Sequence, residues 1–119
     1  MIIDTEDLAS VDLSGVVENA EHLAPVHPGR ILKLDFLEPL GISESRLARE
    51  TFLLPSRVNK IVRGERGITA DTALRLARFF GTSAQFWLNL QNRHDLERSR
   101  DDAALQAELE RISGVPRSA

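Results

Sequence analysis

The sequence contains no cysteine, which excludes disulfide bridges and thiolate metal sites and fits a reducing cytoplasm. It has no apolar run near the roughly 18 residues that a membrane-spanning helix requires, so we expect no membrane partner. The N-terminus lacks the basic and apolar regions of a signal peptide. The three histidines are not spaced as zinc-finger ligands. These absences predict a cytoplasmic protein that holds no metal.

Recognisable catalytic sets are also missing, because the sequence has no Gly-rich phosphate loop, no His-Glu-x-x-His motif and no clustered carboxylate pair. His27 precedes Pro28 and is interpreted as a residue at the start of a helix rather than as a catalyst. His94 is expected near the C-terminal end of a helix and Asp71 in the first turn of another, where each interacts favourably with the helix dipole. We therefore expect neither an enzyme nor a bound cofactor.

The chain of 119 residues is long enough for one domain with a real core, and its 42% hydrophobic and 28% charged residues are ordinary for a globular protein. The net charge of −3 is unevenly distributed. Residues 1–26 carry six acidic and no basic side chains, residues 27–100 carry 13 basic and 8 acidic ones, and residues 101–119 carry two basic and four acidic ones. This pattern fits a nucleic-acid-binding centre whose acidic arm contacts a basic protein, and it also fits a domain with a solvated tail. Charge alone favours the second interpretation.

From Pro28 onward, apolar residues recur every three or four positions, which is typical of amphipathic helices. This spacing predicts five helices at about 28–38, 44–50, 55–63, 70–80 and 83–94, and a last helix at about 95–112. The expected N-caps are Ser43 and Thr69, and Gly81 is the expected C-cap of the helix at 70–80. Thr82 and Gln85 are expected to form a capping box for the fifth helix. No run of alternating β-branched residues predicts a core strand.

The segment from Glu44 to Arg63 has the pattern of a helix-turn-helix, with two short helices joined by a tight turn. The residues expected on its buried side are Leu47, Ala48, Leu53, Val58 and Ile61. The opposite face of its second helix then carries Ser56, Arg57, Asn59, Lys60 and Arg63. These side chains can donate to base edges and phosphates, and Arg and Asn can bind guanine and adenine through two hydrogen bonds.

The apolar spacing alone fits an αα-hairpin with a solvated basic face equally well. Two features favour DNA. The second helix carries three basic residues and no acidic one, and Arg66 follows it in the loop. The next helix begins with Thr69 and Thr72, so its N-terminus is a candidate site for a phosphate.

Longer motifs extend along the chain: HPGRIL at 27–32, FLEPLGIS at 36–43, RLA at 46–48, VNKIV at 58–62, RGITADTALRLA at 66–77, FFGTS at 79–83 and FWLNLQ at 86–91. These motifs resemble the HigA family, the antitoxins of type II toxin–antitoxin modules within the wider XRE and phage-repressor-like group. The resemblance covers residues 27–96. We therefore expect an all-α protein, with an acidic N-terminal arm at 1–26, a five-helix lambda-repressor-like helix-turn-helix domain at 27–94, and a C-terminal helix and tail at 95–119.

The resemblance implies a homodimer that binds a palindromic operator and represses its own operon. It also implies a partner toxin like HigB, a small basic ribonuclease with a RelE-like fold. Carried over to this sequence, Ser56, Arg57, Asn59, Lys60 and Arg63 face the major groove, whereas Ser45, Arg46, Thr69 and Thr72 lie near backbone phosphates. The family dimerises through its C-terminal helices, which assigns the dimer interface to Phe86, Trp87 and Leu90. The alternative for these three residues is the core of the monomer.

Three residues depart from the pattern of this group. Phe52 occupies the turn position that usually holds glycine, where positive φ costs a bulky residue about 1 kcal/mol or more. Either the turn differs or Phe52 packs outward. Thr51 replaces an apolar residue, and Glu44 replaces a frequent Gln and is expected to repel a nearby phosphate. Phe52 and Glu44 keep one alternative open, an interaction module that has lost DNA binding. A second alternative is a free-standing XRE-type regulator without a toxin, which a short toxin-like gene next to this one would argue against.

Overall fold

The computed structural model describes residues 25–116, and every regular element in that range is helical. The elements are α3 (Pro28–Ile31), η1 (Leu32–Leu37), α4 (Glu38–Leu40), α5 (Glu44–Thr51), α6 (Pro55–Val62), α7 (Ala70–Phe80), α8 (Ala84–Arg100) and α9 (Ala103–Glu110). The expected all-α class is therefore confirmed. The acidic arm lies outside the described residues, apart from its last two positions.

The first predicted helix is a single rod with a wider π-helical turn, η1, between α3 and α4. It begins at Pro28, where the Nδ1 atom of His27 accepts a hydrogen bond of 2.9 Å from the backbone N–H of Gly29. This bond confirms His27 as a residue that starts a helix. Pro39 does not end the rod, because it lies within α4. The rod ends at Gly41, whose φ of 65° is left-handed.

Helices α5 and α7 begin at the predicted N-caps. The Ser43 hydroxyl accepts a hydrogen bond of 3.0 Å from the backbone N–H of Arg46, and the Thr69 hydroxyl accepts one of 3.4 Å from Thr72. Gly81 ends α7 in the left-handed conformation, as expected. Pro55 occupies the first turn of α6, where its missing N–H leaves no bond unmade.

The start of α8 differs from the prediction by one residue. Ser83 is its N-cap and accepts a hydrogen bond of 3.0 Å from the N–H of Phe86. The hydroxyl of Thr82 instead accepts a hydrogen bond of 2.8 Å from the indole N–H of Trp87. The predicted capping box of Thr82 and Gln85 is therefore wrong, because the Thr82 hydroxyl satisfies a buried indole rather than the end of the helix.

Helix α8 is also longer than predicted, since it continues past His94 to Arg100. Residues 95–100 contain no glycine or proline, so nothing in the backbone chemistry ends the helix there. The chain turns at Asp101, and the Asp102 carboxylate caps α9 by accepting from the N–H groups of Ala104 and Leu105. The predicted last helix at 95–112 is thus divided between the end of α8 and α9.

The core is one cluster centred on Trp87, which is fully buried. The ring of Phe36 lies 4.9 Å from the Trp87 ring and 5.0 Å from the Phe80 ring, so η1, α7 and α8 meet through aromatic contacts. The other fully or nearly fully buried apolar residues are Leu32, Leu37, Leu47, Ala48, Leu53, Val58, Ile61, Ile68, Ala73 and Leu76.

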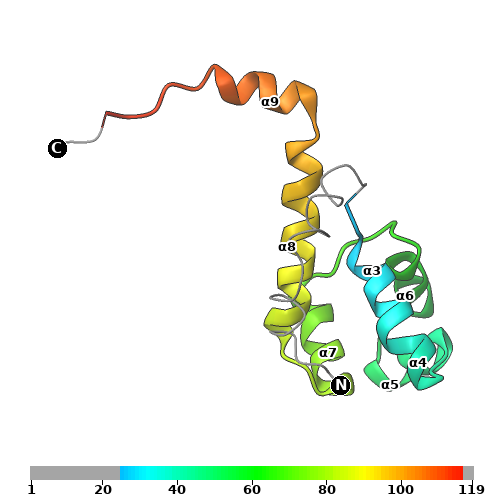
Figure 1. Ribbon diagram of the computed structural model, residues 1–119. Coiled ribbons are helices and arrows are strands. Elements are labelled where there is room, and N and C mark those ends of the chain that lie inside the picture. The colour runs from blue at the N-terminus through cyan, green and yellow to red at the C-terminus, as the bar shows by residue number, and fades with distance from the viewer. Residues whose placement is uncertain (1–24, 117–119) are drawn as a thin grey trace, which may run out of the picture.

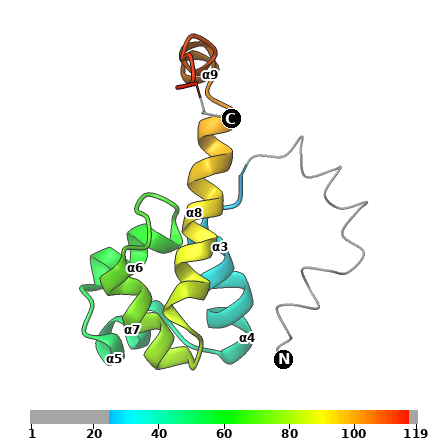
Figure 2. The ribbon, with the colours of Figure 1, turned by 90° about the vertical axis from the view of Figure 1, so that its left-hand side faces the viewer.

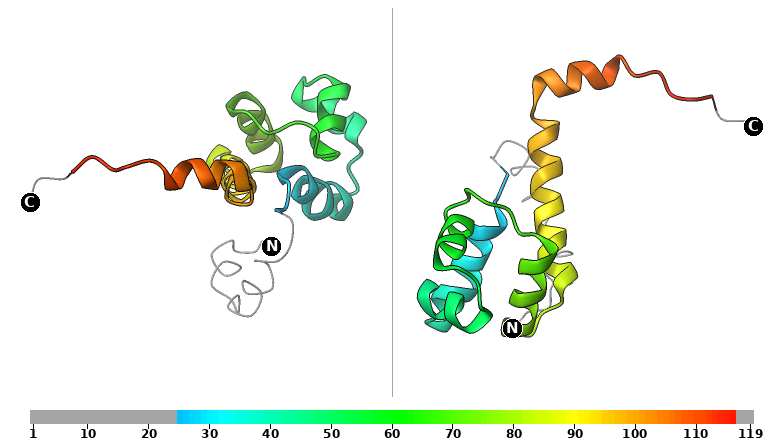
Figure 3. Two further views of the ribbon diagram at one scale, coloured as in Figure 1. Left: turned by 90° about the horizontal axis from the view of Figure 1, so that it is seen from above. Right: turned by 180° about the vertical axis from the view of Figure 1, so that it is seen from behind.

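Helix α8 is the longest helix of the described residues, and other helices pack against it. Its first half packs against α7 and α3, and the shorter helices gather around that half (Figures 1 and 2). The last turns of α8 extend beyond the body and lead to α9, which projects sideways with the C-terminal segment (Figure 3). Over residues 25–116, no helix combines the length and the apolar character that crossing a membrane requires.

Candidate nucleic-acid interface

Helices α5 and α6 form the predicted helix-turn-helix. Leu47 and Ala48 on α5 and Val58 and Ile61 on α6 are each at most 1% exposed, and these side chains lock the two helices together. Ala48 is small, which allows the close crossing of the two short helices. The opposite side of α6 is therefore directed outward.

The turn between the two helices keeps the left-handed conformation that this motif usually gives to glycine. Phe52 has φ 60° and ψ 33°, and its side chain is 85% exposed. Of the two expected explanations, the second holds: the turn is ordinary and Phe52 points outward. Thr51 is buried, and its hydroxyl donates a hydrogen bond of 2.6 Å to the carbonyl of Leu47, so its polar group is satisfied.

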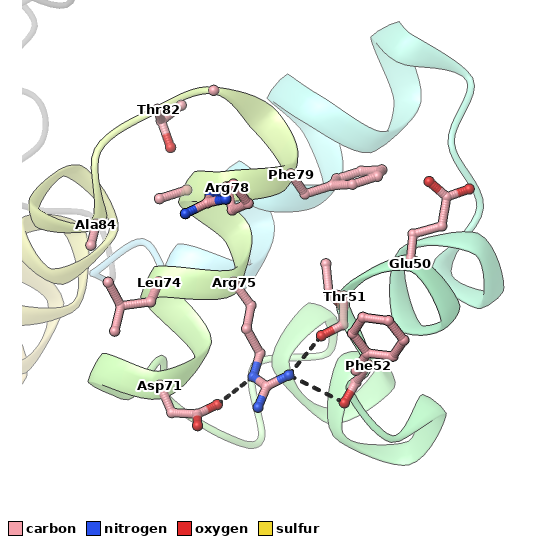
Figure 4. A pocket seen from close by; sticks show the side chains of 12 residues that line it. Glu50, Thr51, Phe52, Asp71, Leu74, Arg75, Arg78, Phe79, Thr82 and Ala84 are labelled. Carbon is pink, nitrogen blue, oxygen red and sulfur yellow. Dashed lines mark hydrogen bonds and ion pairs between the residues drawn. The ribbon is translucent and has the colours of Figure 1, made fainter.

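Arg75 of α7 supports this turn. Its Nη1 atom donates to the carbonyl oxygens of Thr51 at 2.8 Å and Phe52 at 3.5 Å, and its Nε atom donates to Asp71 at 2.7 Å. Figure 4 shows the guanidinium between α7 and the end of α5, at the edge of a surface pocket lined by both helices. The hydrogen bond from Arg75 holds the pKa of Asp71 below its ordinary value, and it raises the pKa of Arg75.

The outer face of α6 carries the predicted groove-facing residues. Ser56, Lys60 and Arg63 are exposed, whereas Arg57 and Asn59 are half-buried. Four of them lie on α6 and Arg63 is its C-cap residue, which brings a hydroxyl, an amide and three cationic groups to one short stretch of chain.

A row of polar groups crosses this surface. The Asn59 Nδ2 atom donates to Glu44 Oε1 of α5 at 3.1 Å, and the Asn59 Oδ1 atom accepts from Arg63 Nη1 at 3.3 Å. Arg63 also forms an ion pair of 3.1 Å with Glu65. Glu44 is therefore hydrogen-bonded to Asn59, a residue expected to contact bases, and the sequence pattern did not predict this bond.

The residues that were expected to contact phosphates differ in their exposure to solvent. Ser45, Arg46 and Thr69 are exposed, at or near the N-termini of α5 and α7. Arg46 is hydrogen-bonded to Glu50 at 3.0 Å on the surface. Thr72 is only 1% exposed, and its hydroxyl accepts from Thr69. The Thr72 side chain therefore faces the interior, whereas the position of Thr72 near a phosphate stays a prediction.

The helix-turn-helix and the helices around it match known proteins. A helix-turn-helix family model matches residues 35–87. Virulence-associated protein I of Dichelobacter nodosus is 53% identical over 77 residues, which are 65% of this chain and 71% of that protein. Antitoxin HigA-1 of Vibrio cholerae is 38% identical over 77 residues, 65% of this chain and 72% of the antitoxin. The solved structure of the Pseudomonas aeruginosa antitoxin HigA with the higBA promoter has a TM-score of 0.69 and 46% identity, and the match covers 76% of this chain and 96% of that chain.

The chain belongs to the HigA family of helix-turn-helix antitoxins.

Two residues of the HigA-like motifs have structural roles that sequence reasoning missed. The Gln91 side chain of α8 accepts a hydrogen bond of 2.7 Å from the backbone N–H of Ile68, and a Cβ atom on Gly67 would lie 3.0 Å from its amide nitrogen. This contact fixes the loop after α6 and thereby the start of α7. A Cβ atom on Gly29 would lie 1.7 Å from the carbonyl oxygen of Ile61, so α3 and α6 touch backbone to backbone.

The three residues assigned to the dimer interface divide into two groups. Trp87 is 0% exposed within its own chain, which supports the core alternative for this residue. Phe86 and Leu90 are half-buried against the core, and their part in a dimer stays a prediction. Residues 25–116 contain no group of three or more side chains that could hold a metal ion.

Proposed function

We propose that this HigA-family chain is a cytoplasmic antitoxin that binds operator DNA as a homodimer, represses its own operon and neutralises a HigB-like toxin. The observation that carries the proposal is the outer face of α6, where Ser56, Asn59, Lys60 and Arg63 stand together on a helix buttressed by α5. The HigA neighbour with this fold was solved with promoter DNA, which supports the same use of the surface here.

In this proposal a dimer places its two copies of α6 in successive major grooves, about 34 Å apart along the duplex. Side chains of α6 read base edges, and Ser45, Arg46 and Thr69 contact phosphates. Neutralisation of phosphates supplies much of the affinity, so binding weakens as salt rises. Phe86 and Leu90 of α8 contribute to the contact between the two copies.

The toxin half of the proposal rests on the family and on charge. A RelE-like ribonuclease is small and basic by the family resemblance, and the first 26 residues of this chain carry six acidic and no basic side chains. Opposite charges speed association by steering the encounter. We place the contact with the toxin outside α6, so that the DNA surface and the toxin surface are separate.

The experiment that tests the DNA half is a mobility shift of the purified protein on the DNA upstream of its own gene, at about 150 mM salt, with shuffled DNA of equal length as the control. We expect a shift of the upstream DNA alone at nanomolar to micromolar protein. Equal binding to both DNAs by a folded protein would contradict the repressor function.

The toxin half is tested by co-expression with the product of a short neighbouring gene. We expect the two chains to purify together, and the toxin alone to stop growth. A neighbouring product that neither binds this chain nor harms the cell would favour a free-standing regulator.

A further inference from the structure

The two end groups of the polar row formed by Glu44, Asn59 and Arg63 determine which way the hydrogen bonds of Asn59 run. Glu44 carries a carboxylate, which only accepts hydrogen bonds, and Arg63 carries a guanidinium, which only donates them. Asn59 lies between these groups, 3.1 Å from the first and 3.3 Å from the second. Its amide can satisfy both neighbours in one orientation alone, with the NH2 toward Glu44 and the oxygen toward Arg63.

This orientation matters because an asparagine amide reads adenine through the same two atoms. The Nδ2 group donates to adenine N7, and Oδ1 accepts from the N6 amino group. Asparagine has two N–H donors and two acceptor lone pairs, and the row uses one of each. The remaining donor and acceptor lie on a half-buried side chain whose amide is held in a single orientation.

We propose that Glu44 is a specificity-determining residue for operator recognition, although it lies on α5 rather than on the recognition helix α6. It holds the Asn59 amide in the orientation that reads adenine, and Arg63 holds the other side. The inference rests on the proposed operator binding and names the base that the site selects. Glu44 thereby acts through Asn59, as a positioning residue.

A purely electrostatic role for Glu44 makes a different prediction. A carboxylate near the duplex repels phosphates whatever the base sequence, so its removal strengthens binding to all DNAs equally. A positioning role instead changes the preference at one base pair in each half-site. The two roles are separated by the pattern of binding across sequences.

The experiment measures the affinity of the full chain for a set of operator duplexes in which each base pair of the half-site is changed in turn. Wild type is expected to prefer A·T at one position, and Asn59→Ala to lose that preference. Glu44→Ala is expected to reduce the preference at this same position about tenfold, because the orientation of the amide is released. Glu44→Gln is expected to keep the preference and bind all duplexes more tightly, because its carbonyl oxygen accepts from Asn59 without the charge.

Glu50→Ala is the matched control. Glu50 is an acidic residue of the same helix, and it is hydrogen-bonded to Arg46 rather than to α6. This variant removes the same charge and is expected to leave the base preference unchanged. A Glu44→Ala variant with the preference of wild type would overturn the proposal, as would an equal change of affinity for every duplex.

A measurement without DNA separates this inference from the proposed function. The two side-chain N–H resonances of Asn59 are expected to be well resolved in wild type and to move toward solvent-averaged values in Glu44→Ala. Unchanged resonances would contradict the positioning role. A wild-type protein with no preference among the duplexes would contradict both operator recognition and this inference. If wild type and Glu44→Ala show the same preference for A·T at that position, only the inference is contradicted.

Discussion

The guanidinium of Arg75 donates a hydrogen bond of 2.8 Å to the main-chain carbonyl of Thr51, across 24 residues of sequence. Thr51 is the last residue of α5, where helix carbonyls lack partners within the helix. The bond therefore caps α5 from outside and ties α7 to the helix-turn-helix. Asp71, one turn before Arg75, holds the guanidinium in place.

The first prediction concerns this capping residue. We expect Arg75→Gln to lower the midpoint of thermal unfolding, because the carbonyl of Thr51 loses its charged donor and Asp71 loses its partner. Thermal denaturation followed by circular dichroism measures the change. Arg78→Gln is the matched control, since Arg78 lies on the same helix and makes no hydrogen bond among the described residues. Equal midpoints for the two variants would argue against the capping role.

Phe52 provides a prediction of increased stability. Phe52→Gly is expected to raise the free energy of unfolding by about 1 kcal/mol, because glycine adopts φ 60° without the strain that a Cβ atom causes. Urea denaturation at pH 7 measures the gain. Phe52→Ala removes the exposed ring but keeps the Cβ atom, so it should bring no comparable gain. A gain of the same size in both variants would assign the effect to the ring.

The backbone contact between α3 and α6 predicts a loss. Gly29→Ala places a Cβ atom 1.7 Å from the carbonyl oxygen of Ile61, so the two helices must separate. We expect a loss of at least about 1–3 kcal/mol in the free energy of unfolding, the usual cost of overpacking a close contact. Gly114→Ala serves as the control, since a Cβ atom there meets nothing within 4 Å. A fully stable Gly29→Ala protein would show that α3 can shift freely.

Arg57 and Asn59 carry the prediction for DNA. Arg57→Ala and Asn59→Ala are each expected to cost about 1–3 kcal/mol in operator binding, through lost contacts to base edges. The double variant is expected to abolish specific binding while leaving the dimer and any toxin complex intact. Mobility shifts measure the loss of operator binding, and analytical ultracentrifugation measures whether the dimer is intact. Loss of folding to the same degree as loss of DNA binding would refute it.

The fifth prediction concerns pH. Burial lowers the pKa of His27 below its usual 6.5, and the neighbouring His94 ring, 4.8 Å away, adds to the effect. The unfolded chain therefore takes up a proton at His27 before the folded chain does, so stability should fall as pH drops below about 6.5. Protonation at Nδ1 also removes the acceptor for the Gly29 N–H.

Urea denaturation between pH 7.5 and 5 tests this dependence. His27→Asn is the control variant, because asparagine also caps a helix but does not titrate. We expect a smaller fall in the unfolding midpoint for this variant than for wild type. Parallel curves would assign the pH dependence to other groups.

The helices could be predicted from sequence because their signals are local. Apolar spacing and the caps Ser43, Thr69 and Gly81 determined α5, α6 and α7 to within a residue or so. The outward side of α6 followed from the same spacing, since the buried positions fix the remaining ones.

The sequence-based expectations fell short where tertiary contacts determine the orientation or the partner of a side chain. Thr72 carries a hydroxyl in a first helical turn, but packing turns it inward, and Thr82 bonds an indole five residues away. Trp87 was assigned to a dimer because the family dimerises through its C-terminal helices, yet the monomer buries it completely. The bond between Glu44 and Asn59 joins residues 15 apart, and no pattern within one helix reveals such a pair.

The length of α8 determines where α9 lies relative to the helix-turn-helix. Its 17 residues span about 25 Å at 1.5 Å per residue, and α9 lies beyond its far end. Helix α9 therefore lies apart from the helix-turn-helix formed by α5 and α6 (Figure 1). We expect a protein bound at α9 alone to leave the outer face of α6 accessible to DNA.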